Sequence, residues 1–463
     1  MSRDKKRQMI WYQVDDGEAA ARRLEKMARK GWLLEAVDNW YYTYRRSDPT
    51  QVKYAVTFFP DASYFDPGLM EGQETYAEYC QAAGWELAAA YGPIQYFLTA
   101  NPDPPPIETD ETIKLTAIRR TMRKTLVLSY AVLLLLPAMG LPLALTRLRH
   151  DPMEFFCSNI QVSNLFLMLG ILLFAGGMLL DYLIWLLRSR YAVAHGGACC
   201  KPHTRFRLFL TAVMMLVCAA SVIGYLTDAS WLRSIFVFYL AVYGGMMILA
   251  RWVLRKLKKA STERSVIRAA YIAFAVIAGL IIGFGATALL TRLVTAGIVH
   301  TSREPAETYA YTSPNGSFRS PRSVYHDDLP VTLEDLGYTV TTGDHCSYEE
   351  QTGRTLLASR SRYTQGPLNP DSALPDLTCQ VYDTRWPWLL QTCWKDLIAD
   401  EGGRYESQIM QRLDPAPWGA AEAYRQEGLT TYYLLYANRI VTFHLSGDAA
   451  PRQLDAIAQA LRP

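Results

Sequence analysis

The sequence predicts a mixed fold, with an α+β domain at each end of the chain and an all-α membrane region of five helices between them. Five stretches are predominantly apolar over about 20 residues, the length that a helix needs to cross a hydrocarbon core of roughly 30 Å. The loops between these stretches alternate between strongly basic and nearly neutral. Polar sequence dominates both ends of the 463-residue chain. These observations together predict one folded domain on each side of a membrane.

Residues 7–100 have the pattern of a compact α+β unit. Aromatic and β-branched content predicts a first strand at residues 9–14. Asp15 or Asp16 is suited to cap the helix that follows. The remaining elements are expected as strand, strand, helix and strand at residues 40–44, 53–59, 74–83 and 95–98. The order strand-helix-strand, occurring twice, predicts a ferredoxin-like split βαβ domain.

An internal repeat runs through this unit. Residues 27–44 and 80–96 both contain the end of a helix, a Gly-Trp pair, a leucine and a tyrosine-bearing strand. The pairs are Gly31-Trp32 and Gly84-Trp85. Each glycine is expected to end its helix in a left-handed conformation. Both tryptophans are expected to fill the core, and the alternative is that one of them lines a groove.

Three segments carry a resemblance to a known family. They are Leu24-Glu-Lys-Met-Ala-Arg-Lys-Gly-Trp-Leu-Leu34, Ala83-Gly-Trp-Glu-Leu87 and Tyr96-Phe97. Together they resemble the uncharacterised bacterial family of domain of unknown function 2812. The resemblance covers about the first hundred residues. It implies a bacterial, Gram-positive plasma-membrane protein in which the domain precedes several membrane spans. It also implies a gene that lies beside a PadR-type transcription regulator. It implies no activity, because the family has no settled function.

Residues 101–124 are expected to form a Pro-rich linker that continues into a basic juxtamembrane segment. Its three consecutive prolines favour an extended, semi-rigid spacer. The membrane domain follows over residues 125–293. Its five helices are expected at residues 125–146, 163–187, 206–226, 234–254 and 269–293.

Lysine and arginine are concentrated before the first span, between the second and third spans, and between the fourth and fifth. Because basic loops stay on the cytoplasmic side, the N-terminus is expected inside and the C-terminal domain outside a bacterial plasma membrane. The N-terminus has no apolar signal-peptide core, so the first span is expected to direct insertion. The basic loops are expected to contact anionic lipid. Nucleic-acid binding is not expected, because no aromatic platform or groove-reading helix accompanies the basic residues.

Asp181 is the one acidic residue inside a predicted span. An intramembrane carboxylate is a functional hypothesis by default. It lies near the basic end of the second span, however, where Arg188 or Arg190 is available to pair with it. A structural role is therefore favoured, and a role in ion or substrate passage is the alternative.

The fifth span carries small residues at a spacing of four. They are Ala275, Gly279, Gly283 and Thr287. Small side chains let another helix approach closely, so this ladder predicts a helix-packing face. Packing within the same chain is favoured, and homodimerisation is the alternative.

One loop combines the residue types that bind zinc. It contains His195, Cys199, Cys200 and His203. Adjacent cysteines are poorly placed to ligate one tetrahedral ion, and the usual Cys-x-x-Cys spacing is absent. We therefore expect a reduced pair of thiols, and no metal or cofactor.

Residues 301–324 are expected to form an irregular stalk, and residues 325–463 an extracytoplasmic α+β domain. Strands or mixed segments are expected at residues 331–340, 354–361 and 376–383, and a helix at residues 388–400. Alternating apolar residues predict a hairpin of strands at residues 430–436 and 439–445. Pro451 then suits the first turn of a final helix.

Three cysteines lie in this outer domain, where a disulfide is chemically permitted. Cys379 with Cys393 is the preferred pair, because the intervening loop is short. Cys157, in the first outer loop, is then available to partner Cys346. Four tryptophans, Trp386, Trp388, Trp394 and Trp418, are expected mainly in the core, with an aromatic ligand surface as the alternative.

No catalytic signature is present in the sequence, since neither Gly-x-Ser-x-Gly nor His-Glu-x-x-His occurs. The leading hypothesis is a non-enzymatic sensor or regulatory protein. It would join an outer domain with an unknown ligand to an inner domain that contacts a cytosolic protein partner. A transport or channel component that uses Asp181 is the alternative, and a membrane-anchored ectoenzyme is the third hypothesis.

Overall fold

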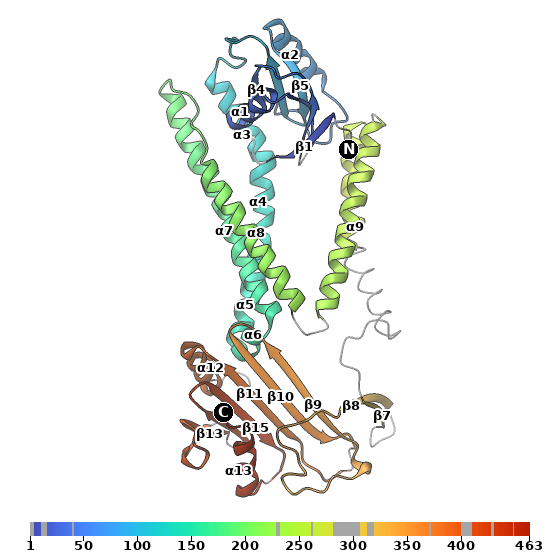
Figure 1. The fold of residues 1–463 in the computed structure, drawn as a ribbon, viewed down its shortest axis with the longest axis vertical. Helices are drawn as coiled ribbons and strands as arrows, with labels where there is room; N and C mark the ends of the chain where they lie inside the picture. Colours follow the sequence, from blue (N-terminus) through green and yellow to red (C-terminus); the bar gives the residue numbers. More distant parts are fainter. Residues whose placement is uncertain are drawn as a thin grey trace. The chain divides into compact units, whose positions relative to one another are not determined.

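The structure of the chain is a computed structural model that describes residues 4–10, 16–38, 41–227, 232–260, 263–280, 306–312, 319–369, 372–399, 410–426, 430–447 and 449–463. The chain divides into two compact units. The first comprises residues 1–139, 167–219 and 237–292, and the second comprises residues 140–166, 220–236 and 293–463. Figure 1 shows the elements of both units.

The N-terminal domain consists of two β-α-β-β halves. The first half contains β1 (Lys5–Met9), α1 (Gly17–Ala28), β2 (Trp32–Val37) and β3 (Tyr41–Arg46). The second contains β4 (Lys53–Phe58), α2 (Glu71–Ala82), β5 (Glu86–Tyr91) and β6 (Ile94–Thr99). Each half forms a three-stranded antiparallel sheet, in the order β1-β3-β2 and β4-β6-β5. The two halves of the sequence repeat therefore have the same order of elements and the same strand pairing.

The two halves also share a local irregularity. β2 shifts register between Leu34 and Ala36, and β5 shifts register between Leu87 and Ala89. The same offset of 53 residues relates Leu34 to Leu87 and the start of β3 to the start of β6. The hydroxyls of Tyr42 and Tyr96 lie 3.4 Å apart, so β3 and β6 contribute to one shared core.

The predicted ferredoxin-like order is wrong, because the domain has six strands in two sheets. The missed strands are β2 and β5, which occupy the same position in each half. β5 contains three consecutive alanines, which have low β-propensity. The Gly-Trp pair before each strand indicated the end of a helix but gave no sign that a strand begins at once.

The membrane region begins with one long helical stretch. It comprises α3 (Glu111–Met122), a π-helical turn η1 (Arg123–Val127), α4 (Leu128–Leu133) and α5 (Leu135–His150). α4 ends four residues before Pro137, which cannot donate the hydrogen bond that Leu133 would accept in a regular helix. The helices that follow are α6 (Pro152–Cys157), α7 (Asn159–Ala194), α8 (Thr204–Thr227), α9 (Leu232–Lys259) and α10 (Arg264–Leu280).

Three helices in the described part of the chain are long and apolar enough to cross a membrane. They are Glu111–His150, Asn159–Ala194 and Thr204–Thr227. α9 covers the predicted fourth span, and α10 covers the first half of the predicted fifth span, whose second half lies outside the described residues. Three described helices thus have the length and composition of membrane spans, and a total of five spans remains a prediction.

The C-terminal domain is a seven-stranded antiparallel sheet in the order β12-β13-β14-β15-β11-β10-β9. Its strands are β9 (Cys346–Arg354), β10 (Ala358–Pro367), β11 (Leu377–Thr384), β12 (Met410–Leu413), β13 (Glu422–Gln426), β14 (Thr431–Leu435) and β15 (Arg439–Leu445). Its helices are α12 (Pro387–Ala399), α13 (Pro451–Ala460) and the short turns η3 (Thr342–Asp344) and η4 (Ala416–Trp418). The predicted β14–β15 hairpin and final helix are confirmed.

This sheet has a hydrophobic core on each face. One core contains Val441 and Phe443 of β15 with Ile457 of α13. The other contains Tyr382 of β11 and Leu389 of α12, and α6 contributes Met153 and Cys157 to it. Side chains alternate between the faces of a strand, which explains why β11 supplies both cores. The short helix α6, in the loop after the first membrane helix, is thus part of the core of the C-terminal domain.

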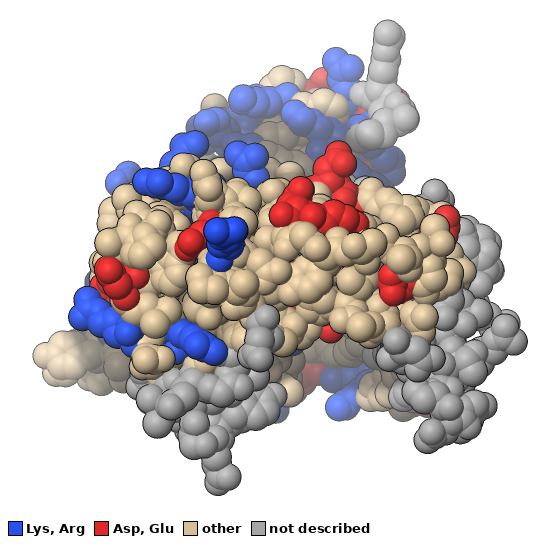
Figure 2. All heavy atoms as spheres, turned by 90° about the horizontal axis from the view of Figure 1, so that it is seen from below, with Lys and Arg blue, Asp and Glu red and all other residues tan. Residues whose placement is uncertain are grey.

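The predicted stalk is an ordered hairpin over its described residues. β7 (Glu307–Thr312) pairs antiparallel with β8 (Arg319–Val324). Residues 331–340, expected as a strand or mixed segment, form turns that bury Val331 and Leu333. In the view of Figure 2, acidic and basic residues form small separate groups with much uncharged surface between them.

Candidate functional site

Asp181 lies on α7 and is buried, with 3% of its side chain exposed. The Nε of Arg207, on α8, donates a hydrogen bond to its Oδ2 over 2.5 Å. The Nδ1 of His203 lies 2.9 Å from its Oδ1. Arg207 is also buried, so this carboxylate and guanidinium neutralise each other away from water.

His203 extends this pair into a chain of polar contacts. The Nη1 of Arg188 lies 3.0 Å from the Nε2 of His203. A guanidinium can only donate, so Nε2 is the acceptor and the ring proton is on Nδ1, facing Asp181. Arg188, His203, Asp181 and Arg207 therefore form one continuous network of polar contacts.

The network exists because the α7–α8 loop folds back along α7. The Nε1 of Trp185 donates to the carbonyl of Cys200 over 2.7 Å. The backbone N–H of Cys200 donates to the Oγ of Ser189 over 3.1 Å. The start of α8 therefore lies beside residues 181–189 and not beside the end of α7 at Ala194. We call residues 195–203 the fold-back loop.

The fold-back loop and the start of α8 bind the N-terminal domain and its linker. The Oγ1 of Thr204 donates to Asp16 over 2.7 Å, and Lys201 pairs with Glu18 at 3.2 Å. The backbone N–H of Cys199 donates to the Oε2 of Glu111 over 2.9 Å. Burial opposes ionisation of Glu111, but the Cys199 N–H and Lys114 outweigh it and lower the pKa of this carboxyl.

α7 and α8 pack closely through glycines. A Cβ on Gly170 would lie 2.9 Å from Val217, and a Cβ on Gly177 would lie 2.8 Å from Leu210. Both distances are shorter than real Cβ contacts, so a larger residue at either position requires Val217, Leu210 or the helices to shift. The close approach keeps the Asp181–Arg207 pair in register.

Residues 16–130 match the family model described as Protein of unknown function (DUF2812). The N-terminal domain is a DUF2812 domain. The match begins at Asp16, which accepts the hydrogen bond from Thr204, and ends at Tyr130, inside the first membrane helix. The matched residues thus extend beyond the two sheets through α3 and η1 into α4. No curated protein and no solved structure is detectably similar to this chain.

The four residues considered for zinc have separate partners. His195 contacts the carbonyl of Tyr191, and His203 contacts Asp181. Cys199 and Cys200 contact Glu111 and Ser189 through their backbones. In the part of the chain that the structure describes, no three His, Cys, Asp or Glu side chains are grouped to hold a metal ion.

The repeated Gly-Trp pairs of the DUF2812 domain have structural surroundings. Gly31 and Gly84 both have positive φ angles, of 78° and 86°. Trp85 is buried beside Phe97 and donates to the carbonyl of Pro105, which fastens the linker. Trp32 is half-buried against the core that the two halves share.

The predicted packing ladder lies only partly within the described residues. Ala275 and Gly279 belong to α10, whereas Gly283 and Thr287 lie outside the described residues. The close approach of α7 and α8 at Gly170 and Gly177 was not predicted, although two glycines spaced by seven positions were the available signal.

The predicted Cys379–Cys393 disulfide is wrong, because both thiols are free. Cys379 lies in the core that α13 covers, whereas Cys393 lies in the core on the opposite face. Burial raises the pKa of the Cys379 thiol to about 12 and that of Cys393 to about 11. Cys157 and Cys346 are also free thiols. Cys379 and Cys393 are close in sequence, but the sheet lies between their side chains, and the sequence spacing gave no sign of this.

The four tryptophans do not form one ligand surface. Trp394 is buried in the core beneath α12, and Trp418 packs on the opposite face of the sheet. Trp386 and Trp388 are exposed.

His203 and Arg207 are the partners of Asp181 that sequence reasoning missed. In the sequence, His203 belongs to the loop with zinc-binding residue types, and Arg207 is one of the basic residues around the start of the third span. An arginine just inside an apolar span that follows an acid-bearing span was the available signal.

Proposed function

We propose that the protein is a non-enzymatic, multi-pass protein of a bacterial plasma membrane that relays the state of an outer domain to a cytosolic DUF2812 domain. In this proposal the chain crosses the membrane five times, with its N-terminus inside. The outer sheet domain binds a ligand or a partner, and the DUF2812 domain contacts a cytosolic protein.

The observation that carries the proposal is the pair of attachments of α7. At its N-terminal end, the Nδ2 of Asn159 donates to the carbonyl of Arg354 in the sheet domain, and α6 lies in the core of that domain. At its C-terminal end, the fold-back loop binds Glu18 and Glu111 of the DUF2812 domain. One unbroken helix of 36 residues thus has an attachment to a folded domain at each end. Such a helix is suited to transmit a displacement.

The same attachments support the proposed topology. The basic loop between α7 and α8 contacts the DUF2812 domain. The basic segment around Arg264 does so too, because Arg264 pairs with Asp66 at 3.3 Å. The loop with α6, which is poor in net charge, packs into the sheet domain. Near α6, Leu356 and Trp388 are exposed, as residues at a membrane–water interface often are.

The test uses the full chain in lipid nanodiscs. Cell-wall precursors, peptides and antimicrobials are screened for a rise in thermal stability, and any binder is then examined by hydrogen exchange. A relay predicts altered exchange in the fold-back loop when the ligand binds outside. Asp181→Asn should preserve ligand binding and abolish this inner response, because the neutral amide no longer holds Arg207 and His203.

Each result that would contradict the proposal differs from the others. A ligand that binds outside and leaves exchange in the fold-back loop unchanged would refute the relay. Flux into proteoliposomes that Asp181→Asn abolishes would favour the transport hypothesis. Turnover of a screened compound would favour the ectoenzyme.

A further inference from the structure

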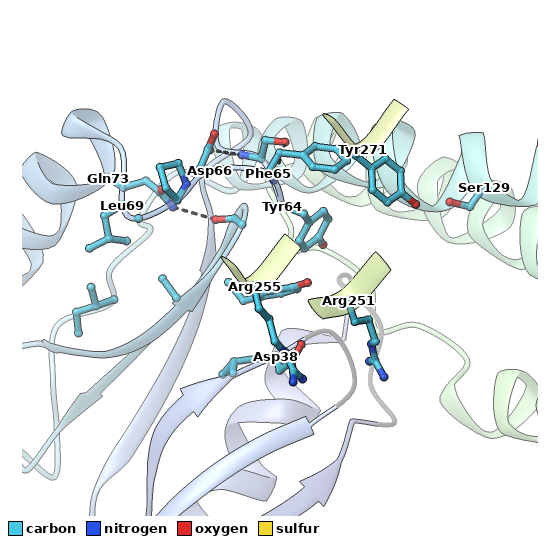
Figure 3. A pocket seen from close by; sticks show the side chains of 18 residues that line it. Asp38, Tyr64, Phe65, Asp66, Leu69, Gln73, Ser129, Arg251, Arg255 and Tyr271 are labelled. Atoms are coloured by element: carbon cyan, nitrogen blue, oxygen red, sulfur yellow. Dashed lines mark hydrogen bonds and ion pairs between the residues drawn. The ribbon is translucent and has the colours of Figure 1, made fainter. Parts of the chain in front are cut away.

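Two adjoining cavities lie between the DUF2812 domain and the membrane helices, within one compact unit. Their volumes are about 860 Å³ and about 500 Å³. They have five lining residues in common, namely Val37, Asp38, Tyr64, Tyr91 and Ser129. Figure 3 shows the larger one. Volumes of this size are typical of sites for small molecules.

The smaller cavity is an aromatic and apolar chamber. Tyr42 and Tyr96 form part of its wall from the shared core of the DUF2812 domain. Met122 and Leu126 close it from the first membrane helix. The chamber therefore offers an apolar surface at the level where the chain enters the membrane region.

The larger cavity has a cationic rim. Arg251 and Arg255, one turn apart on α9, both line this cavity, and Figure 3 shows the side chain of Arg255 beside Asp38. Arg255 pairs loosely with Asp38 at 3.7 Å. Arg251 has no hydrogen-bond or ion-pair partner among the described residues. Burial raises the pKa of the nearby Tyr91 phenol to about 12, and the charge of Arg251 only partly opposes this rise.

The acids of this cavity already have partners, so the uncompensated charge is positive. Asp66 accepts the backbone N–H of Ser63 over 2.6 Å and pairs with Arg264 at 3.3 Å. Only 7% of its side chain is exposed. A cationic ligand would therefore meet Arg251 without a free carboxylate to bind.

The cavity also lies where the two halves of the domain meet. β2 ends at Val37 and is followed by Asp38, and Ala90 and Tyr91 at the end of β5 are the equivalent positions, offset by 53 residues. All four line the larger cavity. The corresponding strand ends of the two halves therefore line the same cavity. The first half contributes the carboxylate of Asp38, and the second half contributes the phenol of Tyr91.

We propose that this double cavity binds an amphipathic anion, with its carboxylate or phosphate head at Arg251 and Arg255 and its apolar body in the tyrosine-lined chamber. The chemistry fits a soluble fatty acid and an anionic membrane lipid equally. This inference does not depend on the proposed relay, because it involves neither the outer domain nor Asp181.

Binding is measured with the full chain in phosphatidylcholine nanodiscs, using the fluorescent fatty acid parinaric acid as the probe. Arg251→Gln is expected to raise the apparent Kd about tenfold or more, since it removes a charge-assisted hydrogen bond. Lys256→Gln is the matched control: it removes the same charge from the same helix, but Lys256 stacks over Trp252 outside the cavity. Its apparent Kd should be unchanged.

A second pair of variants tests the chamber independently. Ser129 lies at the junction of the two cavities and is exposed, so Ser129→Phe should block the junction with little effect on folding, whereas Ser129→Ala should bind normally. Oleate should displace the probe, and oleylamine, which has the same chain and a cationic head, should not. Equal displacement by both, or full binding by Arg251→Gln and Ser129→Phe, would overturn the proposal.

A further arm identifies the source of the anion. Nanodiscs with phosphatidylglycerol are compared with nanodiscs of phosphatidylcholine alone. Competition by phosphatidylglycerol would support entry from the bilayer. Undiminished probe binding in its presence would support a soluble ligand that enters from the aqueous side.

Discussion

Arg207 on α8 donates through Nε to Asp181 on α7 over 2.5 Å, and both side chains are buried. Desolvating two charges is costly, and the pair is favourable only while both members are present and well oriented. The contact therefore fixes how far α8 extends along α7. It also aligns Thr204 with Asp16 of the DUF2812 domain.

Removal of one member of this pair is expected to be much more harmful than removal of both. Asp181→Ala should lower the free energy of unfolding by about 3–5 kcal/mol, because Arg207 is left buried without a counter-charge. The double variant Asp181→Leu with Arg207→Leu should be more stable than Asp181→Ala. Reversible unfolding in mixed micelles, followed by circular dichroism, measures each variant.

The exposed pair of Glu18 and Arg22 serves as the reference for that measurement. Its atoms lie 3.3 Å apart in solvent, so Arg22→Ala should change stability by about 1 kcal/mol or less. Equal losses in the buried and exposed pairs would contradict our interpretation of Asp181.

The close packing of α7 and α8 predicts different outcomes at two adjacent glycines. Gly177→Leu should separate the helices, because even a Cβ there would lie 2.8 Å from Leu210. Gly176→Leu is the control, since a Cβ at Gly176 meets nothing within 4 Å. We expect Gly177→Leu to cost about 1–3 kcal/mol or more and Gly176→Leu to stay near wild type in a thermal-stability assay. Similar melting of both variants would contradict this packing.

The sheet domain should depend on residues far away in the sequence. Leu389 is fully buried in the core that α6 shares, so Leu389→Ala should cost about 2–5 kcal/mol. Leu356 is fully exposed, and Leu356→Ala should change stability by about 0.5 kcal/mol or less.

A fragment of residues 325–463 would lack Met153 and Cys157 of α6. It should bind the dye ANS more strongly than the full chain, and equal dye binding per molecule would argue against this shared core.

The contact between Glu111 and the fold-back loop should depend on pH. Hydrogen bonding lowers the pKa of Glu111 in the folded chain, so the stability that it contributes is present above the unfolded value of about 4.3. That stability is lost as the pH falls through the lower, folded value. Glu111→Gln should remove this dependence and speed amide exchange at Cys199 about tenfold at neutral pH. Amide exchange at Cys199 that is the same in both proteins would count against the contact.

The sequence predicted the features that depend on local pattern. Gly31 and Gly84 identified two helix ends and a repeat, and the apolar alternation around residues 437 and 438 identified the β14–β15 hairpin. The resemblance to domain of unknown function 2812 was confirmed. In each case the residues that carry the signal are close together in the chain.

The features that it missed depend on tertiary contacts. β9 and β10 are polar strands whose pairing with each other and with β11 outweighs their composition. The opposite positions of Cys379 and Cys393 follow from the sheet between them. The partners of Asp181 follow from a loop that reverses along its own helix. None of these arrangements has a periodic signal in the sequence.

The shared bulges at Leu34 and Leu87 have a practical consequence for anyone dissecting the N-terminal domain. Each position of β3, and each position of β2 after Trp32, has a counterpart 53 residues later in β6 or β5. The same substitution can therefore be made at two equivalent strand positions of one molecule, and a difference between the two effects measures what the surroundings of each strand contribute.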